Sequence, residues 1–317
     1  MAGVARPEAI PPAAELVRRA ISGKRIDVGA RLFEGILLFS LLAALAILVT
    51  LLADVVGRGW VVYAERGTEF LTSGNSRDPA QAGVGQALFG SLALMVIVAI
   101  VSFPLGIGAA IYLEEYARDT PFTRFITVNI RNLAGVPAIV YGLLGLAVFV
   151  IALQDLTGPN SNGRSIISGG LTLAIVVLPI VIITASEALR AVPGTIREAA
   201  LGVGATRWET IRSHVLPYAA PGILTGTILA MARAFGEAAP LIMVGGAASF
   251  VAAGDANLID QLFGPYMAMP TLVYNWAGLP NQDFRALTAA GIMALLTTIL
   301  LVNAIAIVLR NRYARRW

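Results

Sequence analysis

The sequence predicts an all-α integral membrane protein with six transmembrane helices. Apolar residues make up 57% of its 317 residues and charged residues only 13%, and the mean hydropathy is +0.77. A soluble domain carries about 25% charged residues, because its surface must be hydrated. The apolar residues lie in runs that, at about 1.5 Å per residue, can cross a hydrocarbon core about 30 Å thick.

The chain begins with a basic tail over residues 1–31, which we expect to stay in the cytoplasm. An apolar run over about 32–53 follows and forms the first expected span. This run is longer and starts later than the apolar core of a cleaved signal peptide, so we interpret it as a helix that stays in the protein. The chain therefore divides into the tail and one transmembrane domain over 32–317.

The next two expected spans contain residues that bend or break helices. A second span is expected over about 84–112, where Pro104 predicts a kink of the kind that membrane helices tolerate. The apolar stretch 121–153 is too long for one span, and we divide it near Leu133–Pro137. Its first part, which carries Arg131, is expected to lie at the membrane surface, and its second part forms the third span.

Three more apolar runs predict the fourth, fifth and sixth spans, over about 170–189, 219–247 and 286–309. The outer connections are expected as loops over 54–83, 154–169 and 248–284. Tyr274 and Trp276 lie in the last of these loops. Both residue types are enriched where a protein meets the membrane surface, so we expect interfacial anchors there.

The basic residues indicate which ends of the spans face the cytoplasm, because Lys and Arg are enriched in cytoplasmic loops. Most of the 23 Lys and Arg residues lie in the tail, around 118–131, in 190–212 and at 310–316. The outer loops hold Arg58, Arg66, Arg77, Arg164 and Arg285. This bias predicts that both termini are cytoplasmic. It also explains the basic pI without a nucleic-acid partner, since such residues lie near anionic lipids.

The polar segment 193–217 connects the fourth and fifth spans on the predicted cytoplasmic side. Its small residues would let another surface approach the backbone, and Trp208 offers an apolar contact. These features are typical of a docking surface for a second protein. An ordinary amphipathic loop is the alternative.

Capping patterns predict two short helices in this segment. Thr206 and Glu209 have the spacing of a capping box, which predicts that a helix starts after Gly204. Thr195 is expected to cap an earlier helix that starts near Ile196. The segment is therefore expected to form a helix-turn-helix that lies against the membrane.

Two charges, Arg233 and Glu237, lie inside the fifth expected span. Each costs about 2.5–3.5 kcal/mol at the membrane centre on insertion scales, and such residues normally mark a transport route. Four residues apart, they share a helix face and can partly neutralise each other. The planar, permanently charged guanidinium suits an oxyanion. We expect a transport path here, and a buried pair that only fixes helix packing is the alternative.

Arg131 and Asn132 lie beside the expected break at Leu133–Pro137. They are candidates for the inner mouth of the same path. An equally good interpretation is that they anchor the helix at the membrane surface.

Several kinds of chemistry are excluded by the residues that the chain lacks. There is no cysteine and His214 is the only histidine, so neither disulfides nor a metal site of the Cys or His type is expected. Lys24 is the only lysine, and it lacks the glycine-rich turn and the following hydroxyl of a P-loop. We therefore expect no cofactor in this chain. ATP and Mg²⁺ would bind a separate ATPase subunit, and the chain itself is expected not to be an enzyme.

The segment 193–217 resembles the EAA loop of binding-protein-dependent ABC importer permeases. The spacing is that of the family, although His214 stands where the family usually has an aliphatic residue. The resemblance implies contact with an ATPase for the residues that carry it, which are Glu198, Ala199, Ala200, Gly204, Leu216 and Pro217.

Further stretches within an importer core over about 84–310 look like the A-type permease subunit of phosphate-specific transporters. They are Tyr112–Tyr116, Asn132–Pro137, Leu178–Pro193, Arg233–Pro240 and Met269–Trp276. The resemblance implies a type I ABC importer (MetI-like) permease fold with a cytoplasmic coupling helix, in a bacterial plasma membrane. It also implies that Arg233 and Glu237 correspond to the intramembrane Arg and Glu of the family.

The same resemblance implies a set of partners. They are a homologous C-type permease, a dimer of cytoplasmic ATPase subunits, an extracytoplasmic phosphate-binding protein, and phosphate as the transported ion. Three other interpretations of the sequence are kept: a permease for another oxyanion such as sulfate or molybdate, a secondary transporter or channel that needs no ATPase, and a structural membrane scaffold.

Overall fold

The computed structural model describes residues 28–246 and 257–314, and these residues are mostly helical. The chain divides into two units, residues 1–54 and 55–317. Helix α2, Val28–Arg66, is longer than the expected span 32–53, and its residues 28–54 are the described part of the first unit. Its apolar side chains are largely exposed, as in a helix surrounded by lipid. Most of the expected tail, residues 1–27, lies outside the described residues.

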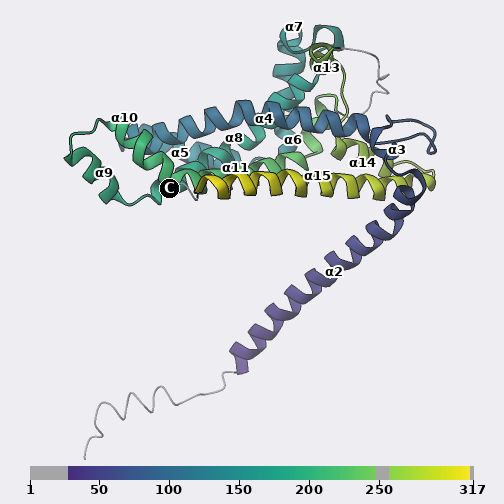
Figure 1. The fold of residues 1–317 in the computed structure, drawn as a ribbon, viewed down its shortest axis with the longest axis horizontal. Coiled ribbons are helices and arrows are strands. Elements are labelled where there is room, and N and C mark those ends of the chain that lie inside the picture. Colours follow the sequence, from purple (N-terminus) through teal and green to yellow (C-terminus); the bar gives the residue numbers. More distant parts are fainter. Residues whose placement is uncertain (1–27, 247–256, 315–317) are drawn as a thin grey trace, which may run out of the picture. The chain divides into compact units, whose positions relative to one another are not determined.

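The second unit is built around α8, Ile166–Arg190, the most buried of its long helices. Helix α4, Gly85–Ile111, and helix α11, Leu216–Phe235, both pack against α8. The last long helix, α15, Asp283–Ala314, packs against α11 (Figure 1). The second, fourth and sixth expected spans are thereby confirmed as helices.

Small residues let these helices approach one another closely. Gly106 of α4 lies against Val181 of α8, and Gly226 of α11 lies so close to Thr184 of α8 that a Cβ would overlap the threonine side chain. Helices in a membrane are not driven together by the hydrophobic effect, so close van der Waals contact supplies much of the attraction. The positions of these glycines therefore fix how α4 and α11 sit on α8.

The expected division of the stretch 121–153 is confirmed. Helix α5, Pro121–Ala134, ends at Gly135, and α6, Ala138–Gly145, continues as the π-helical segment η2, Leu146–Ala152. The two parts meet at an angle of 101°. By length and composition, five helices of the described residues could cross a membrane, and six if this bent pair counts as one span.

The prediction of one continuous fifth span over 219–247 is wrong. Helix α11 ends at Phe235, and the short helix α12, Ala239–Met243, follows after a break. Gly236 caps the end of α11, and Pro240 cannot donate the backbone hydrogen bond that a continuous helix would need. The hydropathy of the stretch conceals this break, because the residues on both sides of it are apolar.

The outer connections contain short helices where the sequence predicted loops. They are α3 (Glu69–Thr72), α7 (Gln154–Thr157), the 3₁₀ turn η3 (Pro159–Ser161), α13 (Leu258–Phe263) and α14 (Met269–Ala277). Residues 247–256 of the expected loop 248–284 lie outside the described part.

The interpretation of Trp276 as an interfacial anchor is wrong. Its side chain is only 3% exposed and packs between the rings of Phe70 and Phe284. Its indole Nε1 donates a hydrogen bond to Asn75 Oδ1 at 3.1 Å. Tyr274, by contrast, is exposed. Trp276 therefore belongs to a second core, which closes the end of the unit opposite α9 (Gly194–Gly202) and α10 (Arg207–Thr210) (Figure 1).

We predict that the substitution Gly226→Val lowers the thermal stability of the purified transporter. Overpacking a well-filled contact costs about 1–3 kcal/mol, and the new side chain would overlap Thr184. The apparent unfolding midpoint in detergent measures the effect. Gly57→Val is the control, because a Cβ at Gly57 meets no atom of the described residues within 4 Å. Equal midpoints for the two variants would contradict the prediction.

Candidate functional site

Two helix breaks that are far apart in the sequence lie against each other. The first follows α5 and the second follows α11, and the helices after these breaks, α6 and α12, pack together. Gly142 of α6 faces Pro240 of α12 so closely that a Cβ on Gly142 would lie 2.7 Å from the proline Cα. Tyr141 is buried, and its hydroxyl donates to the carbonyl of Leu133 at 2.8 Å, across the first break. The structure thereby brings together the stretches that the sequence singled out around 132–142 and 233–240.

Arg233 and Glu237 form the predicted ion pair, with Arg233 Nε 3.3 Å from Glu237 Oε1. They do not share one helix face, because α11 ends between them. Arg233 occupies the last turn of α11, where a cation also interacts favourably with the helix dipole. Its side chain is 57% exposed and that of Glu237 is 20% exposed. The pair thus opens onto the outer surface of this chain, and the guanidinium offers donors beyond the one that meets Glu237.

Arg131 belongs to a different cluster. It lies in the last turn of α5 and lines a small pocket together with Glu114, Glu187 and Arg190. The neighbouring Asn132 accepts a hydrogen bond at its backbone carbonyl from the Gly135 amide at 3.0 Å, which helps to end α5. The predicted path residues therefore fall into two groups, one with Glu237 and one with acidic groups at the ends of α4 and α8.

The predicted helix-turn-helix over 193–217 is present. Helix α9 carries Glu198, Ala199 and Ala200, and the turn after it contains Gly204 at φ +86°, a left-handed conformation that favours glycine. Thr206 caps α10: its hydroxyl accepts from the Glu209 amide at 3.3 Å, and the Glu209 carboxylate accepts from the Thr206 amide at 2.8 Å.

Two details of this segment differ from the prediction. The first helix begins at Gly194 after Pro193, and Thr195 is not its cap. The second helix does not stop at Leu216 and Pro217, which lie in the first turn of α11. A π turn, η4 (Ile211–Val215), joins α10 to α11 and contains the exposed His214. Pro217 is tolerated because the regular hydrogen-bond ladder is already interrupted there.

The turn between α9 and α10 exposes apolar side chains. Val203 is 87% exposed, and Leu201 and Trp208 are about half exposed, while Ala200 is buried. Glu198 and Ala199 are exposed beside them. An apolar cluster with polar neighbours at the end of a helical bundle has the composition of a protein-protein contact.

Three neighbouring residues join the end of α4 to the end of α8 and to the segment 193–217. The family resemblance singled out the stretch that contains them, Tyr112–Tyr116, but their contacts were not predicted. Glu114, Glu115 and Tyr116 lie in η1, the π turn Tyr112–Tyr116 that continues α4. Their partners, in the same order, are Arg190, Arg197 and Arg207. The signal in the sequence was the acidic pair at the inner end of an otherwise apolar run, opposite an arginine-rich segment.

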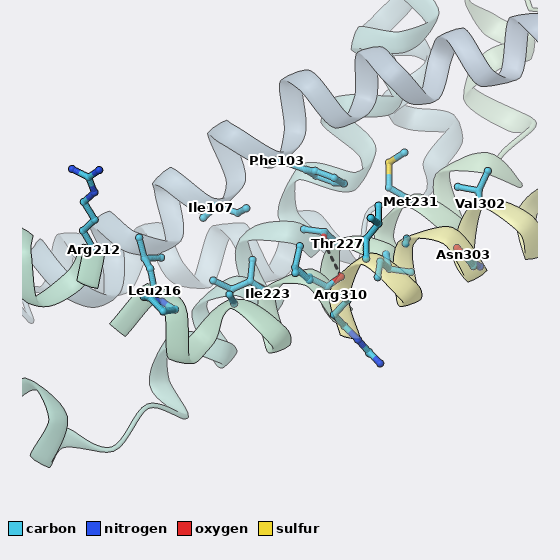
Figure 2. A pocket seen from close by; sticks show the side chains of 16 residues that line it. Phe103, Ile107, Arg212, Leu216, Ile223, Thr227, Met231, Val302, Asn303 and Arg310 are labelled. Atoms are coloured by element: carbon cyan, nitrogen blue, oxygen red, sulfur yellow. Dashed lines mark hydrogen bonds between the residues drawn. The ribbon is translucent and has the colours of Figure 1, made fainter. Parts of the chain in front are cut away.

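A groove of about 800 Å³ lies between α4, α11 and α15. Figure 2 shows Phe103 of α4 and Met231 of α11 pointing into it, with Val302 on α15. Its walls are mostly apolar, although Arg212 and Arg310 line one part. Neither Arg233 nor Glu237 lines this groove, so it is separate from the candidate path. In the described part of the chain, no group of three or more His, Cys, Asp or Glu side chains could hold a metal ion.

Comparison with known proteins identifies a family. The model of the family described as binding-protein-dependent transport system inner membrane component matches residues 102–316. A probable ABC transporter permease protein, YqgI of Bacillus subtilis, is 37% identical over 211 residues, which cover 66% of this chain and 68% of that protein. The phosphate transport system permease protein PstA of Mycobacterium leprae is 36% identical over 270 residues, which cover 84% and 82%.

A solved structure shows the same fold. It is the crystal structure of a bacterial alginate ABC transporter in complex with an alginate pentasaccharide-bound periplasmic protein. The TM-score is 0.56 at 17% identity, and the match covers 90% of this chain and 97% of that chain.

We predict that Thr206→Ala loosens the start of α10. Loss of a capping side chain costs about 1 kcal/mol, since a backbone donor loses its partner. Amide hydrogen exchange of residues 207–210 is expected to become several-fold faster. Thr195→Ala is the matched control, because Thr195 caps no helix and its substitution is expected to leave the exchange of α9 unchanged. Comparable acceleration in both variants would show that the capping box has no special role.

Proposed function

Because the chain belongs to the family of binding-protein-dependent transport system inner membrane components, we propose that it is the permease subunit of an ATP-driven importer of inorganic phosphate. The fold and the relatives make it a multi-pass membrane protein of the ABC importer permease class. The observation that carries the more specific proposal is the Arg233–Glu237 pair at a helix break, in which the Arg233 side chain is about half exposed. The relatives named as phosphate transport permeases support the choice of substrate.

The proposed path follows from the chemistry of Arg233. A guanidinium presents a planar set of donors to phosphate oxygens and stays charged at all physiological pH values. Glu237 at 3.3 Å competes for one of these donors, so it limits how tightly the anion is held. A site that must release its ligand benefits from such competition. Arg131 is the candidate for the inner mouth of the path, beside the pocket that it shares with Glu187.

The exposure of Arg233 on this chain requires another surface to complete the path. We assign that surface to a homologous C-type permease, because a cation left facing lipid would be costly. A phosphate-binding protein would deliver the ion from outside. Both termini and the segment 193–217 would lie in the cytoplasm, in a bacterial plasma membrane, as the distribution of basic residues predicts. The described end of α15 lies at the same end of the bundle as α9 and α10 (Figure 1).

In this proposal a dimer of ATPase subunits binds the cytoplasmic end. The exposed Leu201, Val203 and Trp208, with Glu198 and Ala199 beside them, form the surface that would dock on the ATPase. ATP with Mg²⁺ would be bound and hydrolysed there, and this subunit would supply no catalytic residue. Closure of the ATPases would move the segment 193–217, and the long helices would expose the path alternately to the two sides.

We predict that Arg233→Gln lowers phosphate uptake by about 10- to 100-fold, since a hydrogen bond to a charged group contributes about 1.5–3 kcal/mol. Radiolabelled phosphate uptake by the reconstituted complex measures the effect, with sulfate as competitor and an ATPase-inactive complex as blank. Arg124→Gln is the matched control, because Arg124 forms an exposed pair with Asp119 away from the path. Normal uptake by an assembled Arg233→Gln complex would refute the proposed path. Strong competition by sulfate would favour another oxyanion as the substrate.

We also predict that Glu237→Gln slows phosphate release. Without the competing carboxylate, Arg233 would hold the anion more tightly, so the concentration for half-maximal uptake falls while the maximal rate falls by several-fold. Initial rates over a range of phosphate concentrations separate the two effects. A rise in both quantities would mean that Glu237 has another role.

A further inference from the structure

Arg197 ties the segment 193–217 to the ends of two long helices at once. Its Nη2 lies 2.6 Å from Glu115 Oε1, in the π turn that continues α4, and its Nε donates to the same carboxylate at 3.2 Å. Its Nη1 and Nη2 also donate to the carbonyls of Val192 and Leu189, at 2.9 Å each. One guanidinium in α9 is therefore bonded both to the end of α4 and to the end of α8.

This contact is largely closed to water. The Glu115 side chain is 7% exposed, and Leu189 and Val192 are buried. A buried carboxylate without its cation would be strongly unfavourable. The Val192 carbonyl, just after the end of α8, is bonded by the same guanidinium. Separation of α9 from α4 and α8 would leave the Glu115 carboxylate without its cation and would break both carbonyl contacts, although the Leu189 carbonyl would keep the Val192 amide as a donor. The contact therefore favours movement of the three elements as one body.

Two neighbouring contacts hold the same π turn. Glu114 pairs bidentately with Arg190 in the last turn of α8, at 2.7 and 2.8 Å. The guanidinium of Arg207, in α10, lies 5.3 Å from the centre of the Tyr116 ring. Three consecutive side chains of η1 thus each hold an arginine from a different element. A π turn places an extra residue in the helix and often occurs at functional positions.

The connection continues toward the proposed path. Helix α4 is fixed to α8 by a shared core and by Ser102 Oγ, which donates to the Ala174 carbonyl at 3.0 Å. Helix α11, which carries Arg233, is fixed to α8 at Gly226 and Thr184. Displacement of α4 and α8 would therefore also displace α11, the helix that ends at Arg233.

We propose that η1 is the element through which motion of the segment 193–217 reaches the transmembrane helices, with Glu115 and Arg197 as its positioning residues. The proposal rests on the proposed function, because it needs an ATPase to move the segment. It assigns these two residues no contact with phosphate or ATP. Their role is to make ATP hydrolysis and helix movement strictly dependent on each other.

The first test measures coupling in proteoliposomes that contain the complete transporter. For Glu115→Gln, Arg197→Gln and the double variant, phosphate uptake and ATP hydrolysis are measured in the same preparation. The number of ATP molecules hydrolysed per phosphate imported is expected to rise at least several-fold in each single variant, with no further rise in the double variant. The double variant Asp119→Asn with Arg124→Gln is the matched control, since it removes an exposed ion pair that does not hold α9.

The second test measures distance and does not depend on the transported ion. The chain has no cysteine, so spin labels can be attached at Thr195→Cys in α9, outside the proposed docking surface, and at Leu105→Cys in α4, both exposed positions. Addition of a non-hydrolysable ATP analogue to the complete transporter is expected to leave this distance unchanged when Glu115 and Arg197 are present. In the Glu115→Gln variant, the nucleotide is expected to change the distance.

The outcomes separate the two proposals. An unchanged ratio of ATP to phosphate in the assembled variants, or a nucleotide-dependent distance with the natural pair in place, would overturn the assignment of η1. The distance is also measured with Glu115 and Arg197 unchanged. This measurement can refute the assignment even if no variant of these two residues assembles. A transporter that moves no phosphate but keeps the distance fixed would refute the proposed substrate alone.

Discussion

The close contact of Gly142 with Pro240 is the interaction on which the candidate path depends. A helix that stops inside a membrane leaves backbone carbonyls and amides without partners, and such breaks persist only where protein or water covers them. In this chain, two breaks are covered by the same contact, because the short helices that follow them pack together. A larger residue at either position would separate the breaks and expose their backbone. Arg233 lies in the last turn before the second of these breaks.

Different interactions hold the end of the bundle that we propose to be cytoplasmic. There charged side chains add to an apolar core, and the arginines of α8, α9 and α10 meet a single π turn. A bidentate pair of guanidinium and carboxylate, such as Arg190 with Glu114, has a specific geometry, whereas apolar helix surfaces can shift past one another more easily. A permease that moves as a few rigid bodies needs both kinds of contact. Apolar contacts between its long helices allow them to shift, and the polar contacts of η1 hold the helix ends together.

Much of the fold could be predicted from the sequence, because hydropathy and length report directly on the solvent around a helix. The divided third span, the helix-turn-helix and the capping box at Thr206 were all predicted from local signals. The break after Phe235 was not, because apolar residues continue on both sides of it. The role of Trp276 was also mistaken, since residue type alone does not distinguish a membrane surface from a protein core.

The candidate site was predictable only in part. The pairing of Arg233 with Glu237 followed from their spacing, but the sequence could not show that the helix ends between them. The partners of Glu114 and Glu115 lie more than 70 residues away, so no local pattern reveals them. Contacts between distant segments depend on how α4 and α8 pack, and that packing is a property of the folded chain. The family resemblance identified these stretches as important without stating what holds them.

The exposed turn at Leu201 and Val203 has a consequence for how the transporter is made. If the turn lies in the cytoplasm, as we propose, its exposed apolar side chains would bind other proteins non-specifically until a partner subunit covers them. A surplus of this subunit would present them to chaperones and proteases, which recognise such surfaces in unassembled proteins. Balanced synthesis of the subunits would then protect each one from degradation, so the cell would control the amount of transporter by the scarcest component.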